Sequence, residues 1–364
     1  MPTETSPPVR RARLGVVIDY SSDFTSSAAD VIEFEKIGVD LVSAAEAYSF
    51  DAVSKLGYLA AVTSTMTLTT GILPLYSRTP TLIAMTAAGL DSVSGGRFEL
   101  GIGTSGPQVI EGFHGVPFTA PLGRTRETVE ICRAVWRREL VEHSGRYYTI
   151  PLPADQGTGL GKPLKLINRP VRSTIPITIA ALTPKSVAQA AEIADGWLPI
   201  FYFPERAARA WGDALAEGAA KRDPSLGRLD VVAQAPLFIG DHTDPAMNEY
   251  RQRLALYIGG MGAREANFYN DLATRYGYGD EAGRIQDLYL TGKKDAAAAE
   301  VPDDLARSTA LIGTETDVRE RLTALVDSGA TTILVQPIGS SRAERIAQVE
   351  ALRGLLNGVL ARRH

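Results

Sequence analysis

The sequence predicts an α/β fold, a (β/α)8 barrel with insertions after its fourth and seventh strands. Short apolar runs rich in β-branched residues alternate with longer helical patterns from one end of the 364-residue chain to the other. Repeated strand–helix units of this kind build either an open doubly wound sheet or a closed barrel. Eight runs qualify as strands, and that number favours closure.

Several predicted strands are apolar along their whole length, as expected for parallel strands that are covered on both sides. In chain order the predicted strands are Leu14–Tyr20, Val39–Ala44, Met66–Ile72, Phe98–Gly103, Ile175–Ala180, Gly196–Phe201, Val231–Ile239 and Thr331–Val335. The predicted helices between them include Ala28–Ile37, Ala52–Thr63, Thr81–Val93, Arg124–Arg138 and Lys185–Ala194. Gly38 and Gly329 stand just before strands, where a helix prefers to end on glycine.

Two stretches interrupt the alternation of strands and helices. Residues 143–172 contain a hairpin-like HSGRYYTI and a loose ADQGTGLGKP. The second stretch, Met247–Asp304, contains helical pieces at Glu249–Ile258 and Arg264–Tyr276. Long excursions from a compact barrel are usually lids, binding loops or oligomer contacts.

The composition indicates one barrel domain, residues 14–364, behind a disordered tail at residues 1–13. The tail is polar and lacks the apolar stretch of a secretory signal, and no run approaches the roughly 18 apolar residues of a membrane helix. The net charge of −4 gives no broad basic field, which argues against a nucleic-acid partner. The single cysteine, Cys132, excludes an intrachain disulfide and fits a reducing cytoplasm. We therefore expect a soluble cytoplasmic protein.

Ligands of such barrels bind where strands end and the following loops begin. After the third strand, Gly71 either lets the chain approach a flat ligand or is an ordinary strand-end glycine before a proline turn. After the fourth strand, residues 101–106 match a G-x-G-x-x-G pattern. No acidic residue about twenty positions later completes a dinucleotide site, so we interpret this segment as a flexible loop whose amides face a ligand.

A helix start follows the fifth predicted strand. Thr183 is a good N-cap and Pro184 fits the first helical position. Free amides and the positive helix end make such a start a phosphate site, and Lys185 adds a charge. Most capped helices bind no anion, but this one starts at the predicted mouth of the barrel.

Two residues are candidates for acid–base chemistry. Glu46 ends the second predicted strand and is either an acid–base or ring-contacting group, or a structural glutamate in a salt bridge. His114 follows the glycine loop and is either a proton donor or a bystander. The histidines and Cys132 form no metal-binding pattern, which argues against a metal-dependent barrel hydrolase.

Taken together, these segments resemble the bacterial luciferase-like oxidoreductases, especially their deazaflavin-dependent branch. The likeness spans about residues 14–340. It is carried by TLTTGILPLYSRTP (67–80), LDSVSGGRFELGIGTSGPQVIEGFHG (90–115), RTRETVEICRAVW (124–136) and AALTPKSVAQAAEIADGWLP (180–199). The family fold is a (β/α)8 barrel, commonly dimeric, that holds the cofactor ring in its mouth. Its members use either FMN with oxygen or coenzyme F420 for hydride transfer.

The resemblance implies roles for particular residues. A non-prolyl cis peptide, here Gly71–Ile72, would back the cofactor ring. The residues that match the family's phosphate-binding segment are Ala180, Ala181, Leu182 and Thr183, and those that match the loop lining the cofactor are Thr104, Ser105 and Gly106.

The chain also departs from the family's pattern. Sugar-phosphate and alcohol dehydrogenases of this branch place a histidine where this chain has Glu46. They also carry a catalytic glutamate near the place where Gly106, Pro107 and Gln108 stand here. The substrate therefore stays open.

These considerations predict an F420-dependent oxidoreductase that acts on a small organic substrate as a homodimer. Glu46 and His114 are the residues we expect to handle protons. One alternative is an FMN-dependent monooxygenase that needs a reductase partner and oxygen. Another is a non-catalytic flavin-binding or carrier protein on a decayed barrel.

Overall fold

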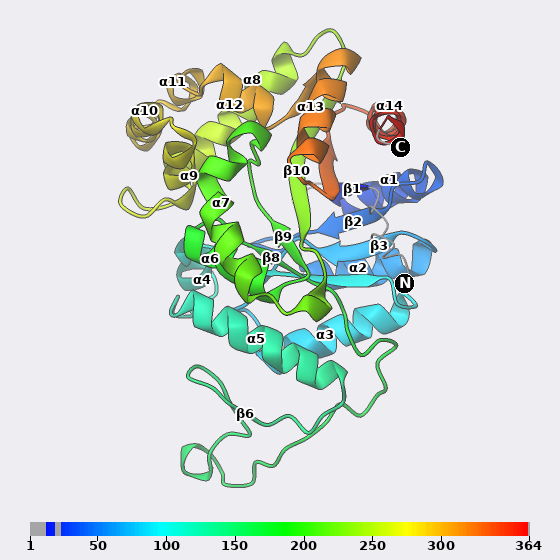
Figure 1. Cartoon of the computed structure of the whole chain (residues 1–364), viewed down its shortest axis with the longest axis vertical. Coiled ribbons are helices and arrows are strands. Elements are labelled where there is room, and N and C mark those ends of the chain that lie inside the picture. Colours follow the sequence, from blue (N-terminus) through cyan, green and yellow to red (C-terminus); the bar gives the residue numbers. More distant parts are fainter. Residues whose placement is uncertain (1–11, 19–22, 363–364) are drawn as a thin grey trace, which may run out of the picture.

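The computed structural model describes residues 12–18 and 23–362. Within them, eight parallel strands form a closed ring, which confirms the predicted barrel (Figure 1). Pairing between the first and last strands, and between the sixth and seventh, completes the ring. In ring order the strands are β1 (Arg13–Ile18), β2 (Leu41–Ala44), β3 (Thr67–Thr70), β5 (Phe98–Gly103), β8 (Ile177–Ala180), β9 (Gly196–Leu198), β10 (Asp230–Ile239) and β12 (Thr332–Pro337).

Helices surround this ring and cover its outer face (Figure 1). They are α1 (Phe24–Lys36), α2 (Ala52–Val62), α3 (Pro80–Val93), α5 (Pro121–Trp136), α6 (Pro184–Ile193), α7 (Pro204–Lys221), α13 (Glu315–Asp327) and α14 (Arg342–Ala361). Burial alternates along β8: Ile177 and Ile179 are buried, whereas Thr178 and Ala180 are half-buried. Successive strand residues point to opposite faces, so the half-buried pair faces the barrel interior.

Charged side chains meet at the end of the barrel where the strands begin. Arg13 donates to Glu99 at 2.7 Å and to Asp230 at 2.9 Å, joining β1, β5 and β10. The predicted tail, residues 1–13, extends one residue too far, because Arg13 begins the first strand. The rest of the tail up to residue 11 lies outside the described residues.

The strands are shorter than predicted where the chain must turn into a loop. The third strand ends at Thr70 and resumes as β4 (Leu73–Pro74), which pairs with β5 instead of continuing β3. The sixth ends at Leu198 rather than at Phe201. One further short strand, β11 (Leu311–Gly313), pairs with the end of β10; nothing in the eight-strand pattern predicted it.

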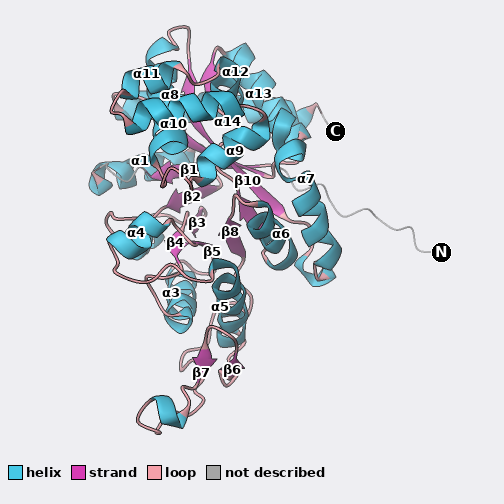
Figure 2. Cartoon of the chain, turned by 90° about the vertical axis from the view of Figure 1, so that its left-hand side faces the viewer, coloured by secondary structure: helices cyan, strands magenta, loops and turns pink. Residues whose placement is uncertain are grey.

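Both predicted insertions are present, and they lie at opposite ends of the molecule (Figures 1 and 2). We call residues 143–172 the arm; it contains the hairpin of β6 (His143–Ser144) and β7 (Thr149–Ile150) and the short helix η1 (Ala154–Gln156). We call residues 244–308 the helical insertion. It consists of α8 (Asp244–Ala255), the π-helix η3 (Leu256–Gly260), α9 (Phe268–Tyr276), α10 (Gly279–Leu290), α11 (Lys294–Ala299) and α12 (Asp303–Ser308).

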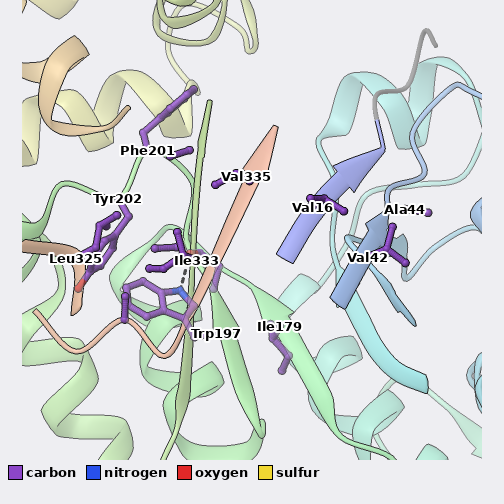
Figure 3. Packing of buried hydrophobic residues seen from close by; sticks show 14 of the residues in the cluster. Val16, Val42, Ala44, Ile179, Trp197, Phe201, Tyr202, Leu325, Ile333 and Val335 are labelled. Atoms are coloured by element: carbon purple, nitrogen blue, oxygen red, sulfur yellow. Dashed lines mark hydrogen bonds between the residues drawn. The ribbon is translucent and has the colours of Figure 1, made fainter. Parts of the chain in front are cut away.

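Large aromatic side chains pack between the barrel and α7. Trp197 lies edge-on to Trp211, with ring centroids 5.1 Å apart, and Tyr202 stacks on Trp211 at 6.1 Å. Figure 3 shows Trp197 and Tyr202 in this packing, with Phe201 farther along toward the helical insertion. Among the described residues, no helix has the length and apolar character needed to cross a bilayer.

Candidate functional site

Small residues bring the backbones of neighbouring strands unusually close at one side of the barrel mouth. A Cβ atom on Gly71 would lie 2.1 Å from Ser43 Oγ. A Cβ atom on Gly101 would lie 1.7 Å from the carbonyl oxygen of Thr70. Neither distance is compatible with a larger residue in the same backbone. Glycine is therefore needed at both positions because neighbouring protein atoms lie so close; the approach of a flat ligand to Gly71 stays a prediction.

The ends of β3, β5 and β8 meet directly above these glycines. The Gly71–Ile72 peptide bond is cis, as the family resemblance implied. A Cβ on Gly103 would lie 3.1 Å from Ile72 Cδ1 and 3.4 Å from Ala180 Cβ. The structure thus brings together Ile72, Gly103 and Ala180, which end three different predicted strands, with Gly71 next to Ile72. We call this surface the rim cradle.

The loop after β5 borders the rim cradle and joins β5 to a short helix. Ser105 has a φ of 58°, a left-handed conformation that is uncommon for residues other than glycine. Such backbone strain is concentrated at functional sites. Gly106 is the N-cap of the short helix α4 (Pro107–Gly112), which the sequence interpretation did not predict. Thr104, which is half-buried, precedes this strained position.

The helix start predicted after the fifth strand is present. Thr183 is the N-cap of α6, its Oγ1 accepts from the Ser186 amide, and Pro184 begins the helix. Within the described residues, no hydrogen-bond partner is found for the amides of Leu182, Thr183 and Lys185. Unpartnered amides at a helix start attract a phosphate group.

An arginine from the helical insertion contacts this loop, and no motif in the sequence indicates it. Arg275 on α9 donates from Nη2 to the carbonyl oxygen of Leu182 at 2.8 Å, although the two residues are 93 positions apart. Its Nε is buried, and no partner for it is found in the described part of the chain. Burial lowers the pKa of Arg275, more than Asp271 raises it. A half-buried cation with a free donor beside unpartnered amides is suited to a phosphate.

Glu46 lies beside the rim cradle and is held by an ion pair. Its amide donates to the carbonyl oxygen of Ile72 at 3.1 Å. Its two carboxylate oxygens accept from Arg78 at 2.5 and 3.0 Å, and one also accepts from the Ala52 amide. The glutamate side chain is 8% exposed. These contacts favour the interpretation of Glu46 as a structural glutamate in a salt bridge. They also place its charge next to Ile72.

His114 lies on the same side of the mouth. Its Nε2 is buried, and no hydrogen-bond partner is found for it within the described residues. The imidazole packs edge-on against Phe113 at 5.3 Å, and Phe113 contacts Tyr48 at 6.2 Å. This aromatic row joins the loop after β5 to the loop after β2, which carries Glu46. An orphaned ring nitrogen is available to a ligand.

The family model described as luciferase-like monooxygenase matches residues 15–332, which is most of the chain. The chain belongs to this luciferase-like family. A Mycobacterium tuberculosis protein provisionally named a coenzyme F420-dependent oxidoreductase is 43% identical over 345 residues, covering 93% of this chain and 98% of its own. The 5,10-methylenetetrahydromethanopterin reductase of Archaeoglobus fulgidus is 29% identical and covers 80% of this chain and 83% of its own.

A solved structure shares the luciferase-like barrel. The coenzyme F420-dependent tetrahydromethanopterin reductase of Methanopyrus kandleri superposes with a TM-score of 0.78 at 22% identity, covering 93% of this chain and 97% of that one. At this identity the likeness shows a shared fold. Among the described residues, no group of three or more His, Cys, Asp or Glu side chains is arranged to hold a metal ion.

Proposed function

We propose that this luciferase-like chain is a coenzyme F420-dependent oxidoreductase, which transfers a hydride between the deazaflavin and a small organic substrate in the barrel mouth. One observation carries the proposal: the rim cradle lies beside unpartnered amides and the orphaned Nε of Arg275. A flat heterocycle and a phosphate are the two parts that such a site fits. The Mycobacterium tuberculosis relative named for coenzyme F420 supports the choice of a deazaflavin.

The residues of the cradle divide the work of holding this cofactor. Gly71 and Ile72 would back the ring, and Thr104, Ser105 and Gly106 would line it. The phosphate would rest on the loop that contains Ala180, Ala181, Leu182 and Thr183, with Arg275 beside it. When bound, F420 supplies the hydride chemistry. The chain supplies the position of the ring and a mouth that limits access of water.

The two acid–base candidates near the ring are proposed to have different roles, and only His114 is proposed to exchange a proton. His114 has the stronger case, because its Nε2 lacks a partner among the described residues and can exchange a proton with a bound substrate. Both oxygens of Glu46 are occupied by Arg78. We therefore infer that Glu46 acts through the Glu46–Arg78 pair, by fixing charge beside Ile72.

Titration of the purified protein with F420 and with FMN, followed by fluorescence quenching, tests the choice of cofactor. We expect F420 to bind with a dissociation constant on the order of micromolar and FMN on the order of millimolar. The opposite ranking would favour the FMN-dependent monooxygenase. Binding without turnover of any candidate substrate would favour the non-catalytic carrier.

We further propose that the protein is a homodimer whose subunits meet through the arm. Apolar side chains on the arm are strongly exposed in the single chain: Leu160 is 83% exposed and Ile167 is 92% exposed. Leu152, Leu164 and Val171 of the arm are exposed as well, and a surface segment with this many exposed apolar side chains is suited to an interface. A cytoplasmic location is supported by Cys132, the sole cysteine of the chain, which is buried and unpaired.

A further inference from the structure

A cavity lies on the side of the mouth opposite the rim cradle. In an eight-strand ring, β12 stands across from β5, so a ligand above the cradle faces the end of β12. The cavity, of about 760 Å³, lies over the carboxyl ends of β10, β12 and β1. Its lining includes Pro236, Gln336 and Arg253. A substrate that reacts with a ring in the cradle would have to lie toward this wall.

Arg253, on α8, is the charged group that stands out in this wall. Its Nη1 donates to Oε1 of Gln336 at 2.7 Å, which holds the guanidinium over the end of β12. Arg253 is half-buried, and no ion pair joins it to any carboxylate of residues 12–18 or 23–362. Its neighbour Arg251 is paired with Asp303. A half-buried cation without a counter-charge is costly, so Arg253 is suited to an anion that arrives with a ligand.

Three of the four acidic residues that line the cavity are held by groups other than Arg253. Asp30 is paired with Arg342 and Arg345. Glu344 accepts from Ser340, and Asp23 caps α1. Glu249, one turn before Arg253 on α8, is exposed and forms no ion pair in the described residues.

Apolar and aromatic groups flank the guanidinium. Tyr250, one turn before Arg253, lines the same cavity, and its hydroxyl is buried against Thr309. Phe201 packs at 6.5 Å from Tyr250 and at 5.2 Å from Tyr257, one turn after Arg253. Tyr250 and Arg253 are three positions apart on α8, so their side chains lie on one face of the helix. Phe34 and Phe238 also line the cavity, so the cation faces a cavity with apolar and aromatic walls.

We propose that Arg253 binds the carboxylate of the substrate, and that the substrate is an organic acid with an apolar body. A guanidinium fits a carboxylate through two parallel hydrogen bonds; with Nη1 held by Gln336, Nε and Nη2 of Arg253 remain for this. The apolar walls of the cavity would take the rest of the molecule. The proposal rests on the proposed function, because it assigns the substrate class of the same mouth.

Calorimetric titration without F420 tests the proposal directly. The probes are straight-chain and phenyl-substituted carboxylic acids of increasing length, each paired with its primary amide. We expect at least one acid to bind about tenfold more tightly than its amide, since charge-assisted hydrogen bonds are roughly twice as strong as neutral ones. Arg253→Met should abolish the preference, Arg253→Lys should retain part of it, and Glu249→Gln, the matched control, should keep it.

Two outcomes would overturn the proposal: no acid preferred over its amide by the unaltered protein, or a preference unchanged in Arg253→Met. Circular dichroism and thermal unfolding check that each variant folds; if Arg253→Met does not, Arg253→Lys and the unaltered protein still decide. F420 titration of the same variants separates the two proposals. We expect F420 affinity to be unchanged in Arg253→Met, whereas an unaltered protein that binds acids but not F420 would remove the proposed function alone.

Discussion

At Gly71 a single hydrogen atom faces Ser43, and any side chain there would collide with the serine hydroxyl. Gly71→Ala places a Cβ 2.1 Å from Ser43 Oγ but 3.5 Å from Ser43 Cβ. We expect the variant to lose about 1–3 kcal/mol of unfolding free energy, as overpacked sites do, and to bind F420 more weakly. Urea unfolding and F420 titration measure the two effects.

The matched control for Gly71 removes the colliding atom. In Gly71→Ala with Ser43→Ala, the remaining contact is an ordinary van der Waals distance, so most of the lost stability should return. A double-mutant cycle with no coupling between the two positions would show that the close approach is not what requires glycine.

Arg275 is a second residue whose effect depends on one atom, the buried Nε that has no partner among the described residues. Arg275→Ala removes the cation beside the Leu182–Thr183 loop, and we expect the dissociation constant for F420 to rise about tenfold, the size of one charge-assisted contact. Arg275→Lys should recover part of this loss. If Arg275→Ala binds F420 as tightly as the unaltered protein over a range of salt concentrations, Arg275 does not contact the phosphate.

Among the elements, the arm hairpin depends on one carboxylate. Glu127 on α5 accepts from the amides of Arg146, Tyr147 and Tyr148 and from His143 Nε2 at 3.2 Å. Burial alone would raise the pKa of Glu127, but these hydrogen bonds outweigh burial and hold the pKa below its ordinary value of 4.5. Glu127 therefore stabilises the folded hairpin above pH 4.5, and this contribution is lost as the pH falls through the lowered pKa.

Hydrogen exchange of the amides at positions 146–148 checks this anchor. We expect Glu127→Gln to lose protection at neutral pH, and the unaltered protein to lose it only in acid, below the ordinary glutamate pKa. Glu130→Gln, an exposed glutamate on the same helix, should change neither. Full protection in Glu127→Gln would mean that the hairpin is held by other contacts.

Elements whose signals are local could be predicted from the sequence. The cap at Thr183 and Pro184 and the glycines that end helices at Gly38 and Gly329, with φ of 81° and 99°, depend on neighbours in the chain and were confirmed. The strand β11 could not be predicted, because its three residues, Leu311–Gly313, form a strand only by pairing with β10.

In the site, too, residues with local signals could be predicted and residues brought in by tertiary packing could not. The cradle residues follow strand ends, where a barrel gathers its ligands. Arg253 and Arg275 come from the helical insertion, and only tertiary packing brings their side chains to Gln336 and Leu182. The partner of Glu46 was equally hidden, since Arg78 reaches it from 32 positions away.

For the whole molecule, the arm and the helical insertion extend the barrel in opposite directions (Figure 2). The insertion contributes to the mouth, whereas the arm leaves apolar side chains exposed. If the arm joins two subunits, Leu160→Ser with Ile167→Ser should convert a dimer to a monomer, measured by light scattering after gel filtration. Leu290→Ser, which changes an exposed residue of the insertion, should leave the mass unchanged. A monomeric unaltered protein would contradict the proposed dimer.

The function proposed for the whole molecule requires that one side of the rim hold both the ring and the phosphate of F420. A crystal structure of the complex tests this most directly. We expect the deazaflavin ring to lie against Ile72, and the phosphate to lie within about 3 Å of the amides of Leu182, Thr183 or Lys185. A complex in which F420 binds elsewhere on the barrel, or with its phosphate away from α6, would contradict the account.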